Sequence, residues 1–546
     1  LQVPVAGSPE HHWGGDNDGK LRQPVNEIGF VVHRGDFDVH RGTFEVTDVR
    51  LDEIAAGSPP PYRSPAPEKN FIAPGSREPI QLQLLMTPTA MPTAALAYCY
   101  RDYSGKTVAG GTAEFDADQQ VISVPPPQQI GYYDLLLPEL GIWSGVVVDE
   151  PFDGEYDDYF AIDSSFSWGG PPDDEAMIRS YLRLLKQNGI RWNRDRIAWD
   201  FINPARNRYH FADRFDLYHR IAASEGIRTL DTFHDTPAWN RLDAPGEYGS
   251  NRYPRDLIAA AGSWSAIVRH WGGTLQALEV WNEPDIFFGN DFPGEFVTAF
   301  TKAVSRQFAA DKIDALVVGG VFASTREESN FYRLYLENGL LADCDVLSFH
   351  TYNVTTALER QMTLLRETEL QLAPDRAGIP YWITECGMPW KRGTHRALVP
   401  DDLHSAAEIV GKALEFRALG VERYFAFEYK YYDENQNNFG MMDRNFAPMR
   451  SMAAYTHLVR AVGNKAYIGD LKLDGAVRSR VFSDGTETVA AVYTGLKERP
   501  TDFLILPAGL PYVRAAGLDG RPLEVNGNRL PMTDGIAYLY LSEPAA

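Results

Sequence analysis

The sequence predicts an α/β protein built around a (β/α)8 TIM barrel, with β-sandwich modules on both sides of it. Between residues 156 and 465, short apolar strands alternate with longer helical patterns, which is typical of βα units around a parallel sheet. Before and after this region the chain shows only short strands separated by turn residues. Eight candidate strands match a barrel, although a doubly wound sheet would show similar alternation.

The first element is a β-like segment over residues 1–57, with alternation in IGFVVH and TFEVTDVRL, and we expect a partial jelly-roll-like fold for it. Its stretch DNDG, residues 16–19, hints at a calcium loop but lacks the ligand spacing, which favours a plain polar turn. Residues 58–79 follow. Their closely spaced prolines predict a stiff, extended linker.

Residues 80–155 predict a β-sandwich. Its candidate strands are IQLQLLM, AALAYCYRDY, QVISV and GYYDLLL, and Ser104-Gly105 marks a hairpin turn. At the other end of the chain, residues 466–546 return to short strands such as VRSRVFS, ETVAAVYT and DFLILP. These form either a second, C-terminal β-sandwich or the other half of the first one.

The barrel region, residues 156–465, begins with a clear strand and helix. Asp173 is placed to cap a helix whose apolar residues recur at helical spacing, and Gly189 is placed to end it. The eight candidate strands are YFAIDSSF, IRWNRDRIAW, IRTLDTF, LQALEVW, ALVVGGVF, CDVLSFH, PYWITE and ERYFAFEY.

Composition excludes several classes of protein. The formal charge of −22 argues against partners that are nucleic acids or anionic membranes, and no run of 18 apolar residues predicts a membrane span. Three cysteines form neither a disulfide framework nor a metal-ligand pattern, so we expect no metal and no cofactor. A chain that starts at Leu1 suits a processed export product, which predicts a secreted or periplasmic protein, but also a trimmed chain.

Functional residues of a barrel gather where its strands end. Two carboxylates, Glu283 and Glu385, follow strands four and seven and would therefore face each other across one mouth. Such a pair can hydrolyse a glycosidic bond, because one carboxyl group protonates the leaving oxygen while the other attacks the anomeric carbon. The other polar candidates at strand ends are Arg196, His234, Asn282, His350, Tyr352 and Glu428.

The motifs around these residues resemble a known group of enzymes. WNEP (residues 281–284) and ITECG (383–387) look like the two signature strands of glycoside hydrolase clan A, and SFHTY (348–352) and RIAW (196–199) match its strand-six and strand-two patterns. DTPAW (235–239), with the flanking sandwiches, looks most like glycoside hydrolase family 39, the β-xylosidase-like group. The resemblance covers residues 155–465.

The resemblance implies a retaining double displacement in which Glu283 is the general acid/base and Glu385 the nucleophile. It also implies that Asn282 bonds the sugar 2-hydroxyl. Arg196 and Tyr352 would hold Glu385 ionised, and Arg194, two residues from Arg196 and on the same face, is a rival for that role. His234 and His350 would line the sugar subsite, or they are core histidines.

The aromatic and acidic candidates leave alternatives open. Trp239, Trp281 and Trp390 either stack on a sugar or pack the barrel rim. At the end of strand eight many clan members have a tryptophan, whereas this chain has Phe427 and Glu428, so Glu428 could bind ring hydroxyls or a basic group. The following loop, DENQNNFG (433–440), is either a hydroxyl-binding rim or an ordinary polar loop.

We therefore expect a retaining glycosidase that acts on an oligo- or polysaccharide. An acidic chain would have to gather Arg and His locally to accept an anionic glycan, so neutral sugars are favoured. Two alternatives remain. One is a non-catalytic carbohydrate-binding protein on a barrel scaffold, and the other is a transglycosylase that uses an acceptor sugar in place of water.

Overall fold

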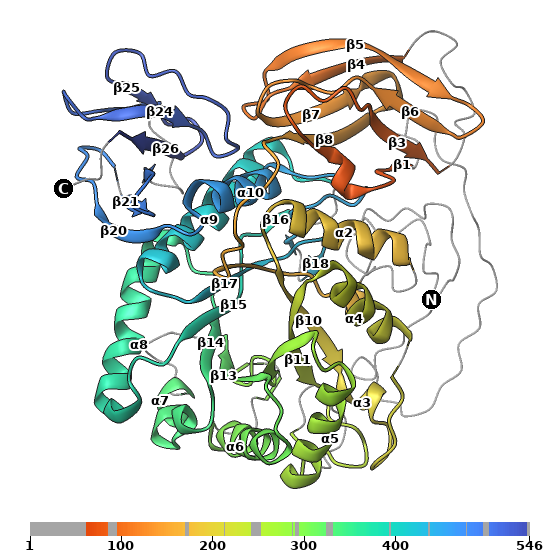
Figure 1. Cartoon of the computed structure of the whole chain (residues 1–546), viewed down its shortest axis with the longest axis vertical. Coiled ribbons are helices and arrows are strands. Elements are labelled where there is room, and N and C mark those ends of the chain that lie inside the picture. The colour runs from red at the N-terminus through yellow and green to blue at the C-terminus, as the bar shows by residue number, and fades with distance from the viewer. Residues whose placement is uncertain are drawn as a thin grey trace, which may run out of the picture.

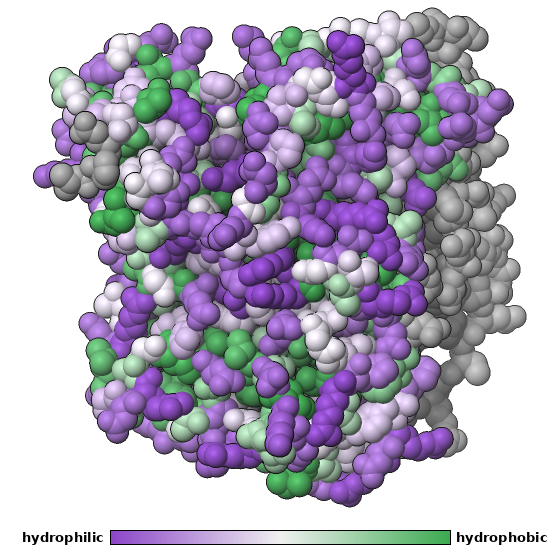
Figure 2. Space-filling model, in the orientation of Figure 1, coloured by the Kyte–Doolittle hydropathy of each residue, from purple (hydrophilic) through white to green (hydrophobic). Residues whose placement is uncertain are grey.

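The computed structural model describes residues 62–542, except 86–95, 170–173, 212, 242–252, 287, 290–293, 324–330, 392–394, 435–436, 477 and 495–501. The expected β segment 1–57, with its DNDG turn, the first residues of the expected linker and Asp173 lie outside the described residues. Figure 1 shows a barrel in the lower part of the view and two β modules above it. The visible surface is mostly hydrophilic (Figure 2).

The barrel contains the eight predicted strands in the predicted order, so the fold class is confirmed. All neighbouring strands are parallel, and β17 closes the ring against β9. The strands are β9 (Phe160–Asp163), β10 (Trp192–Ala198), β11 (Arg228–His234), β12 (Leu275–Val280), β13 (Leu316–Phe322), β14 (Val346–His350), β15 (Tyr381–Gly387) and β17 (Arg423–Phe427).

Helices follow the barrel strands. The first long one begins after Asp174, whose side chain accepts a hydrogen bond from the Met177 amide, so the cap lies one residue beyond the expected Asp173. The helices are α1 (Phe166–Gly169), α2 (Glu175–Gln187), α3 (Trp199–Ile202), α4 (Asp213–Glu225), α5 (Leu257–His270), α6 (Gly294–Asp311), α7 (Phe331–Glu337), α8 (Leu358–Leu372), α9 (Val399–Ala418) and α10 (Arg450–Val462). No described helix is both long enough and apolar enough to cross a membrane.

The barrel interior changes from apolar to charged along its axis. Its lower layer is the buried cluster Ala161, Trp192, Leu230, Ala277, Val318, Val346, Trp382 and Phe425. Two residues further along a strand, the next inward position is polar, as at Asp163, Arg194 and Glu279. An apolar layer of the barrel core therefore lies directly below a charged layer at the carboxyl ends of the strands.

The N-terminal module is one sheet of eight strands that folds over its own apolar core. Strand β5 pairs with β4 through residues 107–113 and with β6 through residues 114–116, so it joins the two halves. The strands are β1 (Tyr62–Arg63), β2 (Phe71–Ile72), β3 (Ile80–Leu84), β4 (Leu96–Arg101), β5 (Thr107–Asp116), β6 (Val121–Val124), β7 (Gly131–Leu137) and β8 (Ile142–Val148). The described part of the expected linker, 62–79, therefore supplies β1 and β2 to this sheet.

The C-terminal module has a core of its own, so it is a second β unit and not the other half of the first. Five strands form its main sheet, β20 (Ala466–Asp470), β21 (Arg478–Ser483), β22 (Thr488–Tyr493), β26 (Ile536–Leu541) and β24 (Tyr512–Ala516), and β23 (Phe503–Ile505) pairs with β25 (Arg529–Pro531).

Buried charges join the N-terminal module to the barrel. Arg450, the first residue of α10, is fully buried; its Nη2 lies 2.6 Å from Asp134 of β7 and its Nη1 3.4 Å from Asp402 of α9. A buried pair of this kind fixes a relative orientation, because breaking it leaves an uncompensated charge.

Candidate active site

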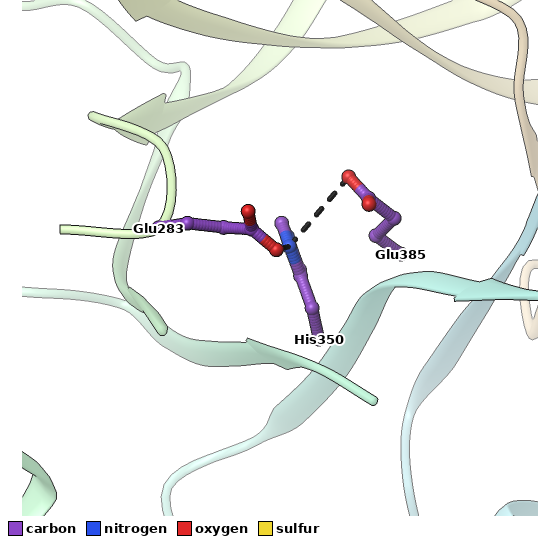
Figure 3. A group of neighbouring side chains, drawn as sticks. All are labelled: Glu283, His350 and Glu385. Atoms are coloured by element: carbon purple, nitrogen blue, oxygen red, sulfur yellow. Dashed lines mark hydrogen bonds and ion pairs between the residues drawn. The ribbon is translucent and has the colours of Figure 1, made fainter. Parts of the chain in front are cut away.

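Glu283, His350 and Glu385 meet at the mouth formed by the carboxyl ends of the strands. Glu283 follows β12, His350 ends β14, and Glu385 lies in β15. One ligand atom from each of the three side chains lies within 4.8 Å of the other two. Figure 3 shows the imidazole of His350 between the two carboxyl groups. The structure thus brings together the two carboxylates that the sequence placed across one mouth.

The WNEP turn aims Glu283 at this mouth by an uncommon backbone path. Trp281 and Glu283 have φ values of 78° and 39°, which non-glycine residues rarely adopt. Two hydrogen bonds hold the turn: the Glu283 amide donates to the Val321 carbonyl (2.9 Å), and the Trp281 indole donates to the Phe288 carbonyl (2.7 Å). Trp281 is completely buried, so it packs the rim and has no face for a sugar.

Glu385 is surrounded by donors that favour its ionised form. Its Oε2 accepts hydrogen bonds from Arg194 Nη1 (3.1 Å) and Arg196 Nη2 (2.9 Å), and its Oε1 accepts one from the Tyr352 hydroxyl. Burial alone would raise the pKa of Glu385, but the charges of His350, Arg196 and Arg194 and the Tyr352 hydrogen bond hold it below its usual value. Both arginines contact Glu385, so the choice that the sequence posed between them does not arise.

Arg194 connects Glu385 to the rest of the site. Its guanidinium contacts Glu279 (2.7 Å), Asp163 (2.5 Å) and the Asn282 side-chain oxygen (3.0 Å). Because Asn282 accepts through its oxygen, its amide nitrogen is left as the donor. Asp163 also pairs with Arg196 through both carboxyl oxygens (2.8 and 3.1 Å).

Sequence reasoning missed Asp163 and Glu279. Both stand inside apolar strand patterns, where a charged residue is uncommon, and that was the available signal.

His350 is bound to Glu283. Its Nδ1 lies 2.8 Å from Glu283 Oε1 and 3.6 Å from Glu385 Oε2. Burial would lower the pKa of His350, but the adjacent Glu385 and Glu283 raise it above its usual value. In the cation, and in the neutral tautomer whose Nε2 accepts from Arg194 (3.5 Å), Nδ1 carries a proton that it donates to Glu283.

Within the described residues, Glu283, His350 and Glu385 are also close enough together to hold a metal ion. Two guanidinium groups already occupy Glu385 Oε2, at 2.9 and 3.1 Å. A metal cation at that oxygen would lie against two fixed positive charges. The donor set therefore suits an ionised carboxylate bound by arginines better than a metal ligand.

His234 and Trp239 lie on the same side of the barrel, in and after the end of β11. His234 is buried and pairs through Nδ1 with Asp235 (2.9 Å). The half-buried indole of Trp239 donates to the Asn203 carbonyl (2.9 Å) and packs edge-on against Trp199. These partners belong to the rim and not to the pair of glutamates.

Two further sequence candidates are enclosed. Trp390 is only 3% exposed; it donates to the Gly440 carbonyl (3.0 Å) and packs with Ala397 and Met449. This packing gives it no free face for a sugar. Glu428 is completely buried and contacts Ser165, not the open mouth. In this structure neither side chain is placed to touch a substrate, because each is buried, Trp390 after strand seven and Glu428 after strand eight.

A small sheet lies beside the nucleophile-like carboxylate, formed by β16 (Trp390–Lys391), β19 (Asn437–Asn438) and β18 (Asp433–Glu434). It contains Asp433, Glu434, Asn437 and Asn438 of the DENQNNFG loop. Burial, and then the charges of Glu385 and Glu283, raise the pKa of Glu434, so this loop lies near the carboxylate pair. The ring of Tyr352 packs against Phe439 and Phe427, at 5.4 and 6.1 Å, and remains 39% exposed.

The fold and the site define a (β/α)8-barrel protein with a paired-carboxylate site at the carboxyl ends of its strands. No family model matches the chain, and no curated protein matches it. Solved structures do match. One is a family 39 glycoside hydrolase from the gut symbiont Bacteroides cellulosilyticus WH2, with TM-score 0.66 and 17% identity, covering 86% of this chain and 98% of that one.

Two further structures are similar over 72% of this chain. The first is a family 39 β-xylosidase from Caulobacter crescentus, with TM-score 0.52, 19% identity and 97% of that chain covered. The second is the family 39 enzyme from Xanthomonas axonopodis pv. citri, with TM-score 0.51, 17% identity and 95% covered. At these identities the matches establish a shared fold, and the fold is the one expected from the sequence motifs.

Proposed function

We propose that the protein is a retaining glycoside hydrolase. The observation that carries the proposal is the approach of the Glu283 and Glu385 side chains, whose facing oxygens lie within 4.8 Å. Retaining enzymes hold their two carboxyl groups about 5–5.5 Å apart, whereas inverting enzymes need about 6.5–9.5 Å to admit a water. The shared fold with glycoside hydrolases supports the same class.

In the first step, Glu385 attacks the anomeric carbon and Glu283 transfers its proton to the leaving oxygen, so the glycosidic bond breaks as the glycosyl-enzyme ester forms. In the second step, Glu283 takes a proton from water, and the water oxygen displaces Glu385 from the sugar. Arg194, Arg196 and Tyr352 supply the donors that keep Glu385 ionised between turnovers.

His350 would keep Glu283 aimed at the leaving oxygen through its 2.8 Å contact. Asn282, with its oxygen held by Arg194, presents its amide nitrogen to the sugar 2-hydroxyl. Both roles need only groups that are already fixed by the barrel.

The charges at the mouth favour a neutral sugar. Arg194 and Arg196 both contact Glu385, and both are also bound by other acidic side chains. An anionic sugar would have to compete with these carboxylates for the guanidinium groups. Because two of the similar structures are described as a β-xylosidase and a family 39 enzyme, β-xylosides are the first substrates to try.

The experiment is a panel of chromogenic β-xyloside, β-glucoside, β-galactoside, β-glucuronide and α-L-arabinoside, tested with wild type, Glu385→Ala and Glu283→Ala. We expect turnover on at least one neutral glycoside and its loss in Glu385→Ala. In Glu283→Ala, azide should restore turnover on a glycoside with a good leaving group. Glu337→Ala, an exposed position on α7, is the matched control.

NMR of the first-formed product anomer separates the mechanisms. Retention of configuration supports the double displacement, and inversion refutes it. Binding of a sugar without hydrolysis by wild type would favour a carbohydrate-binding protein. Transfer to an added acceptor sugar that outpaces hydrolysis would favour a transglycosylase.

A further inference from the structure

Behind Arg196, a glutamate and a lysine form a buried pair just after β17. Glu428 is 0% exposed and Lys430 is 6% exposed. Glu428 Oε1 lies 3.9 Å from Lys430 Nζ, and among the described residues this oxygen accepts no hydrogen bond. The pair carries no net charge whether its proton lies on Lys430 or on Glu428, whereas an unpaired charge in this environment is costly.

Ser165 connects this pair to the catalytic mouth. Its hydroxyl lies within donating distance of Glu428 Oε2 (3.3 Å) and of Asp163 Oδ1 (3.4 Å), while its oxygen accepts a hydrogen bond from Arg196 Nη1. Ser165 has a φ of 46°, a left-handed conformation that serine rarely adopts, so the backbone here is held where this bridge can form. Arg196 in turn donates to Glu385 (2.9 Å). A chain of contacts therefore runs from Lys430 to Glu385.

The charged and titratable groups that surround the pair come from four strand ends. They are Asp163 of β9, Asp195 and Arg196 of β10, Glu385 of β15, and Tyr432 beyond β17. Burial, with Asp163 and Glu385, raises the pKa of Glu428 against the opposing charges of Lys430 and Arg196. Burial lowers the pKa of Lys430, and its acidic neighbours oppose this.

We propose that Glu428 and Lys430 are positioning residues, a mutually compensating buried pair that keeps Arg196 directed at the nucleophile Glu385. This inference rests on the proposed function. With Lys430 in place, any negative charge on Glu428 is compensated by the adjacent Lys430 ammonium. No net negative charge then attracts the Arg196 guanidinium toward Glu428, and the guanidinium keeps its contacts with Asp163 and Glu385.

A substitution of Lys430 alone tests whether the Arg196–Glu385 contact depends on the Glu428–Lys430 pair. In Lys430→Met, Glu428 is neutral at low pH and ionises only as the pH rises, because its pKa already lies above the usual value and loses its main opposing charge. The unpaired anion then competes with Glu385 for Arg196 through Ser165. Activity should therefore fall as the pH rises through the ionisation of Glu428, whereas in wild type Lys430 compensates this ionisation.

The test compares the pH profile of kcat/KM for wild type, Lys430→Met, Glu428→Gln and the double variant Glu428→Gln/Lys430→Met. We expect Lys430→Met to lose about tenfold in kcat/KM as Glu428 ionises, with most of the loss in kcat. The double variant, which has no carboxylate to ionise, should lack this titration and exceed Lys430→Met at high pH. Lys430→Arg, which keeps the charge, should retain the wild-type profile.

Two exposed substitutions control for charge alone: Glu422→Gln at the other end of β17, and Lys472→Met in the C-terminal module. Both should leave the profile unchanged. If Lys430→Met and the double variant share one pH profile, Glu428 is not the titrating group and the proposal fails. The proposal would also be overturned if Lys430→Met, Glu428→Gln and the double variant lost kcat/KM equally and independently of pH.

Thermal unfolding at several pH values separates this proposal from the proposed function. Lys430→Met should lose Tm relative to the double variant as the pH rises, whether or not any glycoside is cleaved. The proposal is also supported if Lys430→Met folds only at low pH while the double variant folds over the whole pH range. If wild type cleaves no glycoside while the Tm curves of Lys430→Met and the double variant still diverge with pH, the proposed enzyme function fails. In that case the proposal that Glu428 and Lys430 compensate each other holds.

Discussion

Replacing Tyr352 with phenylalanine removes one hydrogen bond from Glu385 and little else. The Tyr352 hydroxyl donates to Glu385 Oε1, while the ring packs edge-on against Phe427 and Phe439. Phenylalanine keeps that ring packing. Because Tyr352 is 39% exposed and water can reach the vacated position, we expect the free energy of unfolding to fall by no more than about 1.5 kcal/mol, the lower end of what a hydrogen bond to a charged group contributes.

The effect on catalysis follows from the worth of the lost bond. A hydrogen bond to a charged group contributes about 1.5–3 kcal/mol, which corresponds to roughly a 10- to 100-fold change in rate. The pKa of Glu385 is held below its usual value, and Tyr352 is one of the causes. Loss of this donor raises that pKa, and activity, which needs the ionised form, then disappears at a higher pH as the pH falls.

The assay is the pH dependence of kcat/KM on the best aryl glycoside, measured for wild type and Tyr352→Phe. We expect a loss of about tenfold or more near neutral pH and an acid limb moved upward by up to about one pH unit. Tyr467→Phe is the matched control, since its hydroxyl bonds Asp470 (2.8 Å) in the C-terminal module. An unchanged acid limb with normal kcat/KM would refute the assignment of Tyr352 as a donor to the nucleophile.

Two other predictions concern stability. Arg450→Met removes the cation closest to the buried Asp134 and Asp402 and leaves only the more distant Arg396, 4.0 Å from Asp134, so it should cost about 3 kcal/mol in urea unfolding; a loss below about 1 kcal/mol would contradict a joining role for these charges. Burial and the neighbouring Asp231 raise the pKa of Asp195 from 3.8 to about 7, so the folded state keeps a proton that the unfolded chain releases, and stability falls as the pH rises between those values. Asp195→Asn should remove this fall when unfolding is measured at about pH 4 and about pH 7.5, whereas an unchanged difference would show that Asp195 is not its source.

The barrel could be predicted because its strands carry their signal locally. Most strands are short, largely apolar runs, and the helical periods between them indicate repeated βα units; the number of eight such units then favours a barrel over a doubly wound sheet. The Pro-rich segment after residue 58 could not be read in the same way. Phe71 and Ile72 of β2 pair with Val147 and Val148 of β8, and such distant pairing leaves no trace in the local sequence.

The two glutamates could be predicted for a similar reason, since each lies in a motif of four or five residues. Trp390 shows where this reasoning ends. Its position after strand seven suggested an exposed aromatic, but Ala397 and Met449 from later loops cover it. The exposed aromatic at this mouth is Tyr352, which the sequence had assigned only to Glu385.

The net charge of the chain and the charge of its site turn out to be separate quantities. A formal charge of −22 suggested that cations would be scarce, yet two arginines are buried beside Glu385. Each is held by carboxylates from other strands, Arg194 by Glu279 and Asp163, and Arg196 by Asp163. The arginines are therefore bound to Glu385 and its acidic neighbours. The proposed preference for neutral sugars rests on these existing ion pairs, with which an anionic sugar would have to compete.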